Sequence, residues 1–282
     1  MEVKISAKDV KQLRDMTGAG MMDCKKALVE AGGNIEEAIA ILRKKGQKLS
    51  AKRADRDAKE GAVIAKTSAN RNNGIIVRLS CETDFVAKGE GFVNFANEIA
   101  AIALKNRPDT LEELLALPYA DGLTIGEKVT EQVGVIGEKV EVKAYEKIET
   151  AAGEGQVLSY IHMGNRAAVL VALNLEEPDY IEPGKNVAMQ VAAMKPIALN
   201  KDSVDASVVE KEIEIGMEQA RQQGKPEAML EKIAMGKLNK FYKENTLMSQ
   251  QYVKDGSMNI EGYLKSIHKD LTVTAFKHIA LG

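Results

Sequence analysis

The sequence reads VIAK at Val63–Lys66 and GIIVRLS at Gly74–Ser80, and a similar pair returns as QVLSYI at Gln156–Ile161 and AAVLVAL at Ala167–Leu173. Short apolar runs bounded by glycine and polar residues are typical of strands. A helical pattern follows each pair. The repeat therefore predicts two units of a β-hairpin plus a helix, each helix covering one face of its sheet, in a duplicated α+β core.

The helices that follow the two strand pairs are recognised by apolar residues at helical spacing. They carry Phe92, Phe95, Ile99 and Ile102 in the first unit, and Val187, Val191 and Met194 in the second. We assign residues 61–150 to core subdomain N. Core subdomain C is assigned to residues 151–202 and 248–282, with an insertion between the two segments.

The first 45 residues, 1–45, predict a small domain of three helices. Two N-cap patterns, Ser6 with Asp9 and Asn34 with Glu37, mark the start of the first and third helices. The short helix between them is expected to present one apolar face, formed by Met21, Cys24 and Leu28.

A basic stretch follows these helices, with eight basic and two acidic residues from residue 43 to residue 59, a local net charge of +6. We describe residues 46–60 as a basic linker. Nucleic-acid-binding segments usually combine such charge with aromatic residues that stack on bases, and no aromatic residue interrupts this run. Two interpretations stay open: a solvated linker helix, or a contact with RNA.

Residues 203–247 break the repeat and predict an antiparallel helical hairpin. Ser207 and Glu210 have the spacing of a capping box, and Gly224, Lys225 and Pro226 turn the chain between two amphipathic helices. Long helices with narrow apolar stripes either project as a coiled coil and pair with another surface, including a second copy of the chain, or lie on the core. The hairpin is therefore a candidate surface for self-association.

The overall composition argues against several classes of function. The formal net charge is −2, so no field of the whole chain attracts nucleic acid or anionic lipid. Cys24 and Cys81 lie far apart in the sequence, which suits a reducing compartment. The longest apolar run, Ala167–Leu173, is too short to span a bilayer. We expect a cytoplasmic protein that contacts no membrane.

Motifs for catalysis and cofactor binding are also lacking. The glycines at 18 and 20 follow a helical pattern instead of a strand, so they do not fit a dinucleotide fingerprint. The sequence has no P-loop, and His162, His268 and His278 have no zinc-binding arrangement. We expect no catalytic residue, no bound metal and no cofactor.

One stretch, TDFVAK at Thr83–Lys88, combines helix-capping residues with an aromatic residue in a chain that is only 4% aromatic. Thr83 suits an N-cap and Asp84 suits the first turn of a helix. From the residues alone, Phe85 and Val86 point either into the core or outward. Because the helix that follows has an apolar face of its own, Phe85 is free to protrude, and an exposed Phe favours a binding role.

Two motifs resemble signatures of the bacterial elongation factor Ts family. TGAGMMDCKKAL at Thr17–Leu28 resembles its N-terminal signature, and Thr83–Lys88 resembles its central one. Smaller matches lie in the second strand pair, at His162, Gly164 and Arg166, and at the hairpin turn, Gly224–Pro226. The resemblance extends over almost the whole chain.

The resemblance implies a ubiquitin-associated-like helical domain at residues 1–45, a duplicated α+β core and a coiled-coil hairpin. It implies a nucleotide exchange factor, not an enzyme, that binds elongation factor Tu in its GDP-bound and nucleotide-free forms. Such a factor promotes GDP release by displacing the bound magnesium ion and allows GTP to rebind, with no specific nucleic acid as partner. The alternative is an RNA-associated scaffold protein without exchange activity.

By this resemblance, Thr83, Asp84, Phe85 and Val86 would displace the magnesium ion, with Phe85 wedged between partner side chains. Other partner contacts would be made by Met21, Met22, Lys25, His162, Gly164 and Arg166. The sequence ends directly after a predicted strand at Thr272–Ile279, whereas some family members continue with a further helix, and it carries extra residues around 118–134. We therefore expect exchange to depend more on the N-terminal domain and the Phe85 turn.

Overall fold

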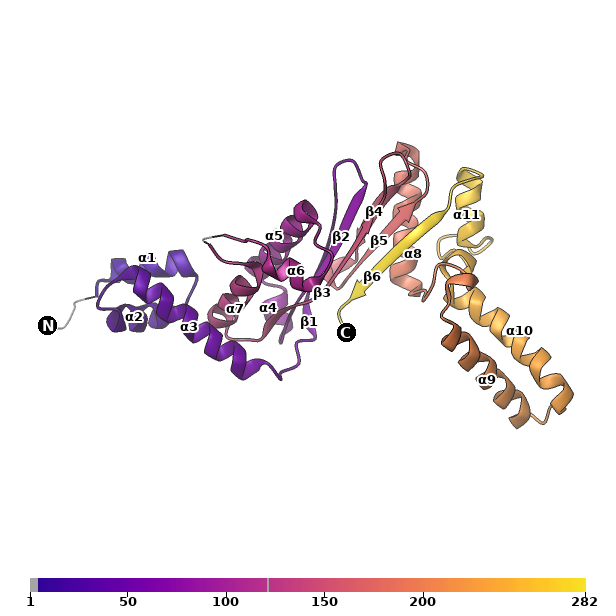
Figure 1. Ribbon diagram of the computed structural model, residues 1–282, viewed down its shortest axis with the longest axis horizontal. Helices are drawn as coiled ribbons and strands as arrows, with labels where there is room; N and C mark the ends of the chain where they lie inside the picture. Colours follow the sequence, from indigo (N-terminus) through magenta and orange to yellow (C-terminus); the bar gives the residue numbers. More distant parts are fainter. Residues whose placement is uncertain (1–4, 121) are drawn as a thin grey trace.

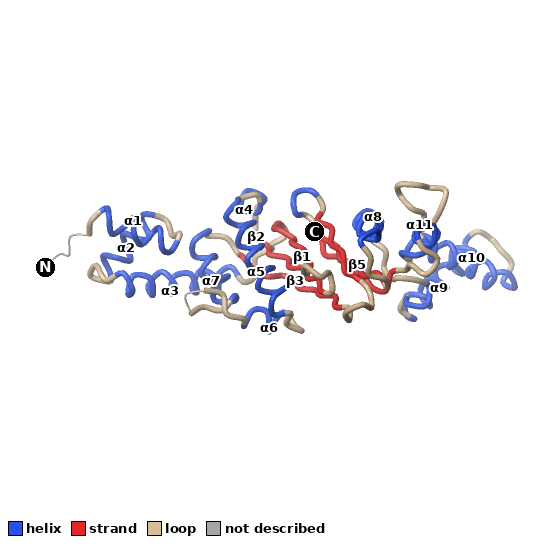
Figure 2. Tube along the Cα trace, turned by 90° about the horizontal axis from the view of Figure 1, so that it is seen from above, coloured by secondary structure: helices blue, strands red, loops and turns tan. Residues whose placement is uncertain are grey.

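The computed structural model describes residues 5–120 and 122–282, so residues 1–4 of the predicted N-terminal domain lie outside the described residues. The molecule is elongated, with helices at the N-terminal end, two β-sheets in the centre and a helical hairpin at the other end (Figures 1 and 2). Each sheet is three-stranded and antiparallel. Antiparallel sheets with helices in separate blocks confirm the predicted α+β class.

The N-terminal helices are α1 (Ala7–Thr17), α2 (Met21–Glu30) and α3 (Ile35–Arg53). Ser6 and Asn34 cap α1 and α3 as predicted, and the three helices enclose a small core that includes Leu13, Cys24, Leu28 and Ala38. Met21 is not part of this core, because its side chain is 59% exposed. The prediction that Met21 belongs to the apolar face was wrong, because helical spacing does not show which residues of that face the neighbouring helices cover.

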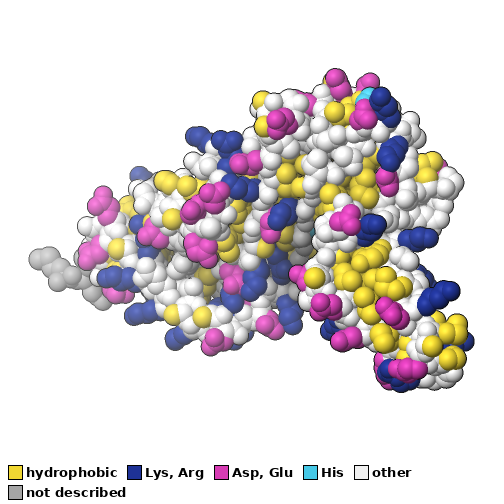
Figure 3. All heavy atoms as spheres, turned by 45° about the vertical axis from the view of Figure 1, so that its right-hand side comes forward, with side chains coloured by type: hydrophobic (Ala, Val, Ile, Leu, Met, Phe, Trp, Pro, Cys, Tyr) yellow, Lys and Arg dark blue, Asp and Glu magenta, His cyan; other side chains and the backbone are white. Residues whose placement is uncertain are grey.

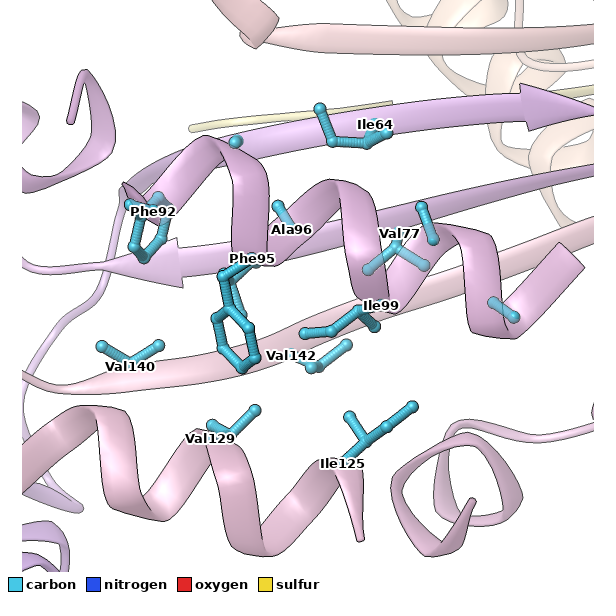
Figure 4. Packing of buried hydrophobic residues seen from close by; sticks show 14 of the residues in the cluster. Ile64, Val77, Phe92, Phe95, Ala96, Ile99, Ile125, Val129, Val140 and Val142 are labelled. Atoms are coloured by element: carbon cyan, nitrogen blue, oxygen red, sulfur yellow. The ribbon is translucent and has the colours of Figure 1, made fainter. Parts of the chain in front are cut away.

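The first sheet consists of β1 (Glu60–Thr67), β2 (Asn73–Cys81) and β3 (Val140–Glu149), in the order β1-β2-β3. Its helical cover comes from α5 (Glu90–Asn106) and α7 (Ile125–Ile136). Figure 4 shows Phe95 and Ile99 of α5 and Val129 of α7 gathered over Val142 of β3. Two short helices, α4 (Asp84–Ala87) and α6 (Leu111–Ala116), complete this half.

The second sheet has the order β4-β5-β6, and α8 and α11 pack on its outer face. The elements of this half are β4 (Gln156–Ile161), β5 (Ala167–Leu173), α8 (Ile181–Met194), α11 (Ile260–Ile267) and β6 (Val273–Ala280). Short 3-10 turns lie at Met163–Asn165, Pro178–Tyr180, Lys201–Ser203 and Leu247–Ser249.

The inner faces of the two sheets pack against each other. A buried cluster joins residues of both sheets, among them Val63 and Ile76 of the first and Val157, Ala168 and Leu170 of the second. Each sheet therefore buries both faces, one under helices and one against the other sheet. This explains why every residue of β5 is buried.

The inserted hairpin consists of α9 (Ala206–Gln222) and α10 (Glu227–Asn245), and it reaches away from the sheets (Figure 1). The predicted capping box of Ser207 and Glu210 is wrong. Asp205 is the N-cap of α9, and its carboxylate accepts a hydrogen bond from the Ser207 N–H at 2.8 Å. A carboxylate two residues earlier is the better placed acceptor, so Ser207 lies inside the helix.

Candidate functional site

The turn Thr83–Lys88 presents one large apolar side chain to solvent. Thr83 is the N-cap of α4, and Ala87 is buried while Val86 packs partly against the core of the first sheet. Because neighbouring helical residues point about 100° apart, the same short helix directs Phe85 away from that core. Phe85 is 86% exposed, which settles the alternative that the sequence left open.

Glu138, at the start of the segment leading into β3, holds the beginning of this turn. Its two carboxylate oxygens accept hydrogen bonds from the Thr83 N–H at 3.0 Å and from Thr83 Oγ1 at 2.7 Å. The Cys81 thiol donates to the Thr83 carbonyl oxygen at 3.2 Å, and burial raises the pKa of this thiol to about 12, so the thiol keeps its proton. Hydrogen bonds therefore hold Thr83 at its N–H, its hydroxyl group and its carbonyl oxygen.

Glu82 connects the same turn to α3 and β3. Arg53 Nη1 and the Lys139 N–H both donate to Glu82 Oε1, at 2.5 and 2.6 Å. Lys139 Nζ in turn donates to the carbonyl oxygens of Ala54 and Arg56. Desolvation raises the pKa of Glu82, but the Lys139 amide and the Arg53 guanidinium outweigh it and leave the pKa below its usual value. Glu82 is therefore an ionised link between the turn and the end of α3.

Asp84 lies at the surface beside Phe85. Lys88 Nζ donates to Asp84 Oδ2 at 2.6 Å, and this hydrogen bond, together with the charge of Lys88, lowers the pKa of Asp84. Exposed pairs of this kind add little to stability. Asp84 is a carboxylate at neutral pH, next to the exposed aromatic ring.

A groove joins the turn to the loop between β4 and β5. Asp84, Ala87 and Lys88 line one side, and Gly164, Asn165 and Arg166 line the other. Arg166 Nη1 forms an ion pair with Glu60 Oε2 of β1 at 3.1 Å, which ties this loop to the first sheet. Two sets of predicted contact residues, separated by about 80 positions in the sequence, thus border one surface feature.

Met163 lies in the same loop and was not among the residues expected from the sequence. It is 84% exposed, close to the value for Phe85. Its neighbour His162 is exposed, and His162 Nδ1 forms a hydrogen bond with the Tyr160 hydroxyl at 3.1 Å. The one signal in the sequence is a large apolar residue within the otherwise polar loop HMGNR, at 162–166.

Met21, Met22 and Lys25 form a separate exposed surface on α2. The two methionine side chains are 59% and 63% exposed. In both Figure 1 and Figure 2, α2 lies well away from α4, toward the N-terminal end of the molecule. The structure therefore brings Asp84 together with Gly164 and Arg166 but does not bring the α2 residues to that groove.

Among the described residues, no three His, Cys, Asp or Glu side chains are grouped in a way that could hold a metal ion. Within residues 5–120 and 122–282, no helix combines the length and apolarity needed to cross a bilayer.

The two-sheet α+β fold, with an exposed aromatic turn beside a groove, defines a class of protein that is suited to contact another macromolecule. A model of the family described as "Elongation factor TS" matches residues 82–282. Elongation factor Ts of Cytophaga hutchinsonii is 55% identical over 98% of this chain and 99% of its own length. Those of Flavobacterium psychrophilum and Chlorobaculum tepidum are 52% and 43% identical, each over 99% of both chains.

The chain therefore belongs to the elongation factor Ts family, and it is a translation elongation factor.

Proposed function

We propose that this protein is the guanine-nucleotide exchange factor of elongation factor Tu. It binds the GDP-bound form, displaces the magnesium ion beside the nucleotide, and leaves a nucleotide-free complex that GTP can enter. The observation that carries the proposal is the exposed Phe85 ring on a turn that Glu138 and Glu82 hold in place. A rigidly presented aromatic side chain with almost no contacts of its own is suited to insert into a partner.

Nucleotide exchange of this kind requires no covalent chemistry. If the factor and GDP each weaken the binding of the other to elongation factor Tu, the coupling free energy is the same in both directions. Speeding GDP release about 10⁴-fold requires a barrier lower by roughly 5.5 kcal/mol. Magnesium neutralises phosphate charge at a nucleotide site, so the loss of this ion is large enough to lower the barrier to GDP release by that amount. We therefore propose an exchange factor that acts in the cytoplasm and is not an enzyme.

We assign the partner contacts to three surfaces. Thr83, Asp84, Phe85 and Val86 act at the magnesium ion. The loop with His162, Met163, Gly164 and Arg166, across the groove, contacts a second region of the partner. Met21, Met22 and Lys25 on α2 contact the G domain. These assignments are supported by the exposure of Phe85, Met163, Met21 and Met22. The first two surfaces also share a groove.

The division of the chain into domains stays a prediction, and so does the ubiquitin-associated-like character of the first domain. The predicted divisions are residues 1–45, 46–60, 61–150, 151–202 with 248–282, and 203–247.

Self-association through the hairpin also stays a prediction. Its support is a set of partly exposed apolar side chains on α9 and α10, Ile215, Met229 and Met235. Figure 3 shows hydrophobic side chains gathered on the hairpin, at the lower right, among charged ones.

The alternative function, an RNA-associated scaffold, receives less support from the structure. The basic stretch is helical as far as Arg53, and five of its eight basic side chains form ion pairs with carboxylates. These five are Arg43, Lys45, Arg53, Arg56 and Lys59. A basic side chain that already pairs with a carboxylate neutralises phosphate less effectively, so fewer counterions leave the RNA and a steep salt dependence of RNA binding is not expected.

The deciding experiment measures release of a fluorescent GDP from the cognate elongation factor Tu by stopped flow, with and without this protein. We expect strong acceleration that excess magnesium suppresses. Acceleration that magnesium leaves unchanged would contradict the ion-displacement step. Binding without acceleration would contradict the exchange function as a whole, and a salt titration of RNA binding would then test the scaffold alternative.

Substituting Glu138 with alanine is expected to lower the rate of exchange about tenfold. The substitution removes the two carboxylate oxygens that accept hydrogen bonds from the Thr83 N–H and hydroxyl group, so the start of the turn loses its fixed position. The free energy of unfolding should fall by about 1 to 2 kcal/mol. Stopped-flow GDP release and urea unfolding measure the two effects. Glu138→Gln keeps one oxygen that can accept a hydrogen bond, so we expect a smaller fall in both the exchange rate and the free energy of unfolding.

A matched control for this experiment is Glu146→Ala. Glu146 lies on β3, eight residues after Glu138, and pairs with Lys277 at the surface, so its loss leaves the turn intact. Equal rates for Glu138→Ala and Glu146→Ala would show that the hold on Thr83 is not needed for exchange.

A further inference from the structure

Helices α3 and α7 meet backbone to backbone at Gly46 and Gly134. A Cβ atom built on Gly134 would lie 2.8 Å from Gly46 Cα, and one built on Gly46 would lie 3.2 Å from the Thr130 carbonyl oxygen. Glycine is less favourable than alanine inside a helix. Helix formation alone therefore does not explain why glycine occupies these two positions. The close approach of the two helices explains it, because a side chain at either position would collide with the other helix.

The crossing lies midway along a helix that joins two parts of the molecule. Near its start, α3 contributes Ala38 to the core of the N-terminal helices. Beyond the crossing, Leu49 packs against the core of the first sheet, and Arg53 bonds to Glu82, directly before the turn. The single helix α3 therefore connects the N-terminal helices, which include α2, to the residue that precedes the Phe85 turn.

Contacts on both sides of the crossing place the N-terminal helices against α7. Arg43 of α3 pairs with Glu131 of α7, with 3.6 Å between Arg43 Nε and the carboxylate. Val135 Cγ1 would lie 3.6 Å from a Cβ on Gly18, in the connection between α1 and α2. The helix α7 therefore touches α3 and the connection that leads into α2. We expect a change in the separation of α3 and α7 to displace this connection, and with it the start of α2 that carries Met21 and Met22.

We propose that Gly46 and Gly134 are positioning residues for exchange. The crossing that they form holds the α2 surface at a fixed orientation to the Phe85 turn, so both surfaces reach one molecule of elongation factor Tu together. This inference rests on the proposed function. Two contacts held in the correct geometry bind with a high effective concentration, and a loose connection lowers it.

The test combines a distance measurement with kinetics on the full chain. Spin labels at Glu30→Cys on α2 and Lys105→Cys on α5 report the orientation, since both positions are exposed and the native Cys24 and Cys81 are buried. We expect Gly134→Leu to broaden or shift the distance distribution between the labels. The factor concentration that gives half-maximal exchange should rise about tenfold, with little change in the maximal rate, because the Phe85 turn is intact.

A matched control is Gly236→Leu in α10, where a Cβ atom meets no other atom within 4 Å. This variant should leave the distances and the exchange kinetics unchanged. Gly46→Ala is the conservative variant and should give a smaller effect of the same kind as Gly134→Leu. Should Gly134→Leu not fold, Gly134→Ala replaces it, because a single methyl group already overlaps Gly46 Cα.

The outcomes separate this proposal from the proposed function. An unchanged distance distribution in the Gly134 variant would overturn the positioning role, and so would a broadened one with unchanged half-maximal concentration. Failure of the unsubstituted protein to exchange nucleotide would overturn the proposed function itself, and that result appears before any glycine is changed.

Discussion

Phe85→Ala is expected to slow stimulated GDP release about 100-fold while changing the free energy of unfolding by less than about 0.5 kcal/mol. A 100-fold effect corresponds to about 2.7 kcal/mol, which is the size expected for an aromatic side chain that becomes fully buried in a complex. The small effect on stability follows because the ring is 86% exposed in the free protein. Stopped-flow GDP release and urea unfolding of the same preparation measure both quantities.

The control for this substitution is Phe92→Ala in α5. Phe92 is buried in the core of the first sheet, so its truncation should cost about 3 to 5 kcal/mol of stability. Similar losses of stability for the two variants would mean that Phe85 belongs to the core. Unchanged exchange by Phe85→Ala, with the protein folded, would refute its role as a wedge.

The second large effect is expected for Leu170→Ala, which should lower the free energy of unfolding by about 3 to 5 kcal/mol. Leu170 is fully buried between the two sheets, in the cluster with Ile76 and Val157. Because folded domains are stable by only about 5 to 15 kcal/mol, this loss is a large share of the total. Urea unfolding followed by circular dichroism measures it.

Ile161→Ala on β4 provides the comparison. Ile161 lies at the end of its strand and is 37% exposed, so truncation should cost less than about 1 kcal/mol. A loss for Leu170→Ala no larger than that for Ile161→Ala would show that the sheets do not pack tightly on each other.

The apolar runs of the sequence predicted β1, β2, β4 and β5, because consecutive residues that point to opposite faces are buried in each of these strands. The edge strand β3 was missed. Its sequence, VEVKAYEKIE, intersperses charged residues among apolar ones, and only Val140, Val142 and Ile148 are buried. The pattern of a half-exposed strand is weaker than a continuous apolar run and was not recognised.

The turn at Thr83–Lys88 was recognisable from the sequence because its capping residue and its aromatic residue are adjacent in the chain. The side chain that holds it, Glu138, is 55 residues away from Thr83. Gly164, Asn165 and Arg166 border the groove beside this turn only because the second sheet packs on the first. The link between Glu138 and Thr83 leaves no signal in the local sequence.

The sequence by itself determined several periodic features of this protein and the family that the chain resembles. It predicted the three N-terminal helices with the caps of α1 and α3, the helices α5, α8, α9 and α10, and every strand except β3. These depend on interactions between residues close together in the chain, so local patterns contain them. The tertiary structure alone decided that Phe85 points outward, that the two sheets bury their inner faces on each other, and that Gly46 meets Gly134. These depend on contacts between distant segments, whose geometry is set by the packing of the whole core.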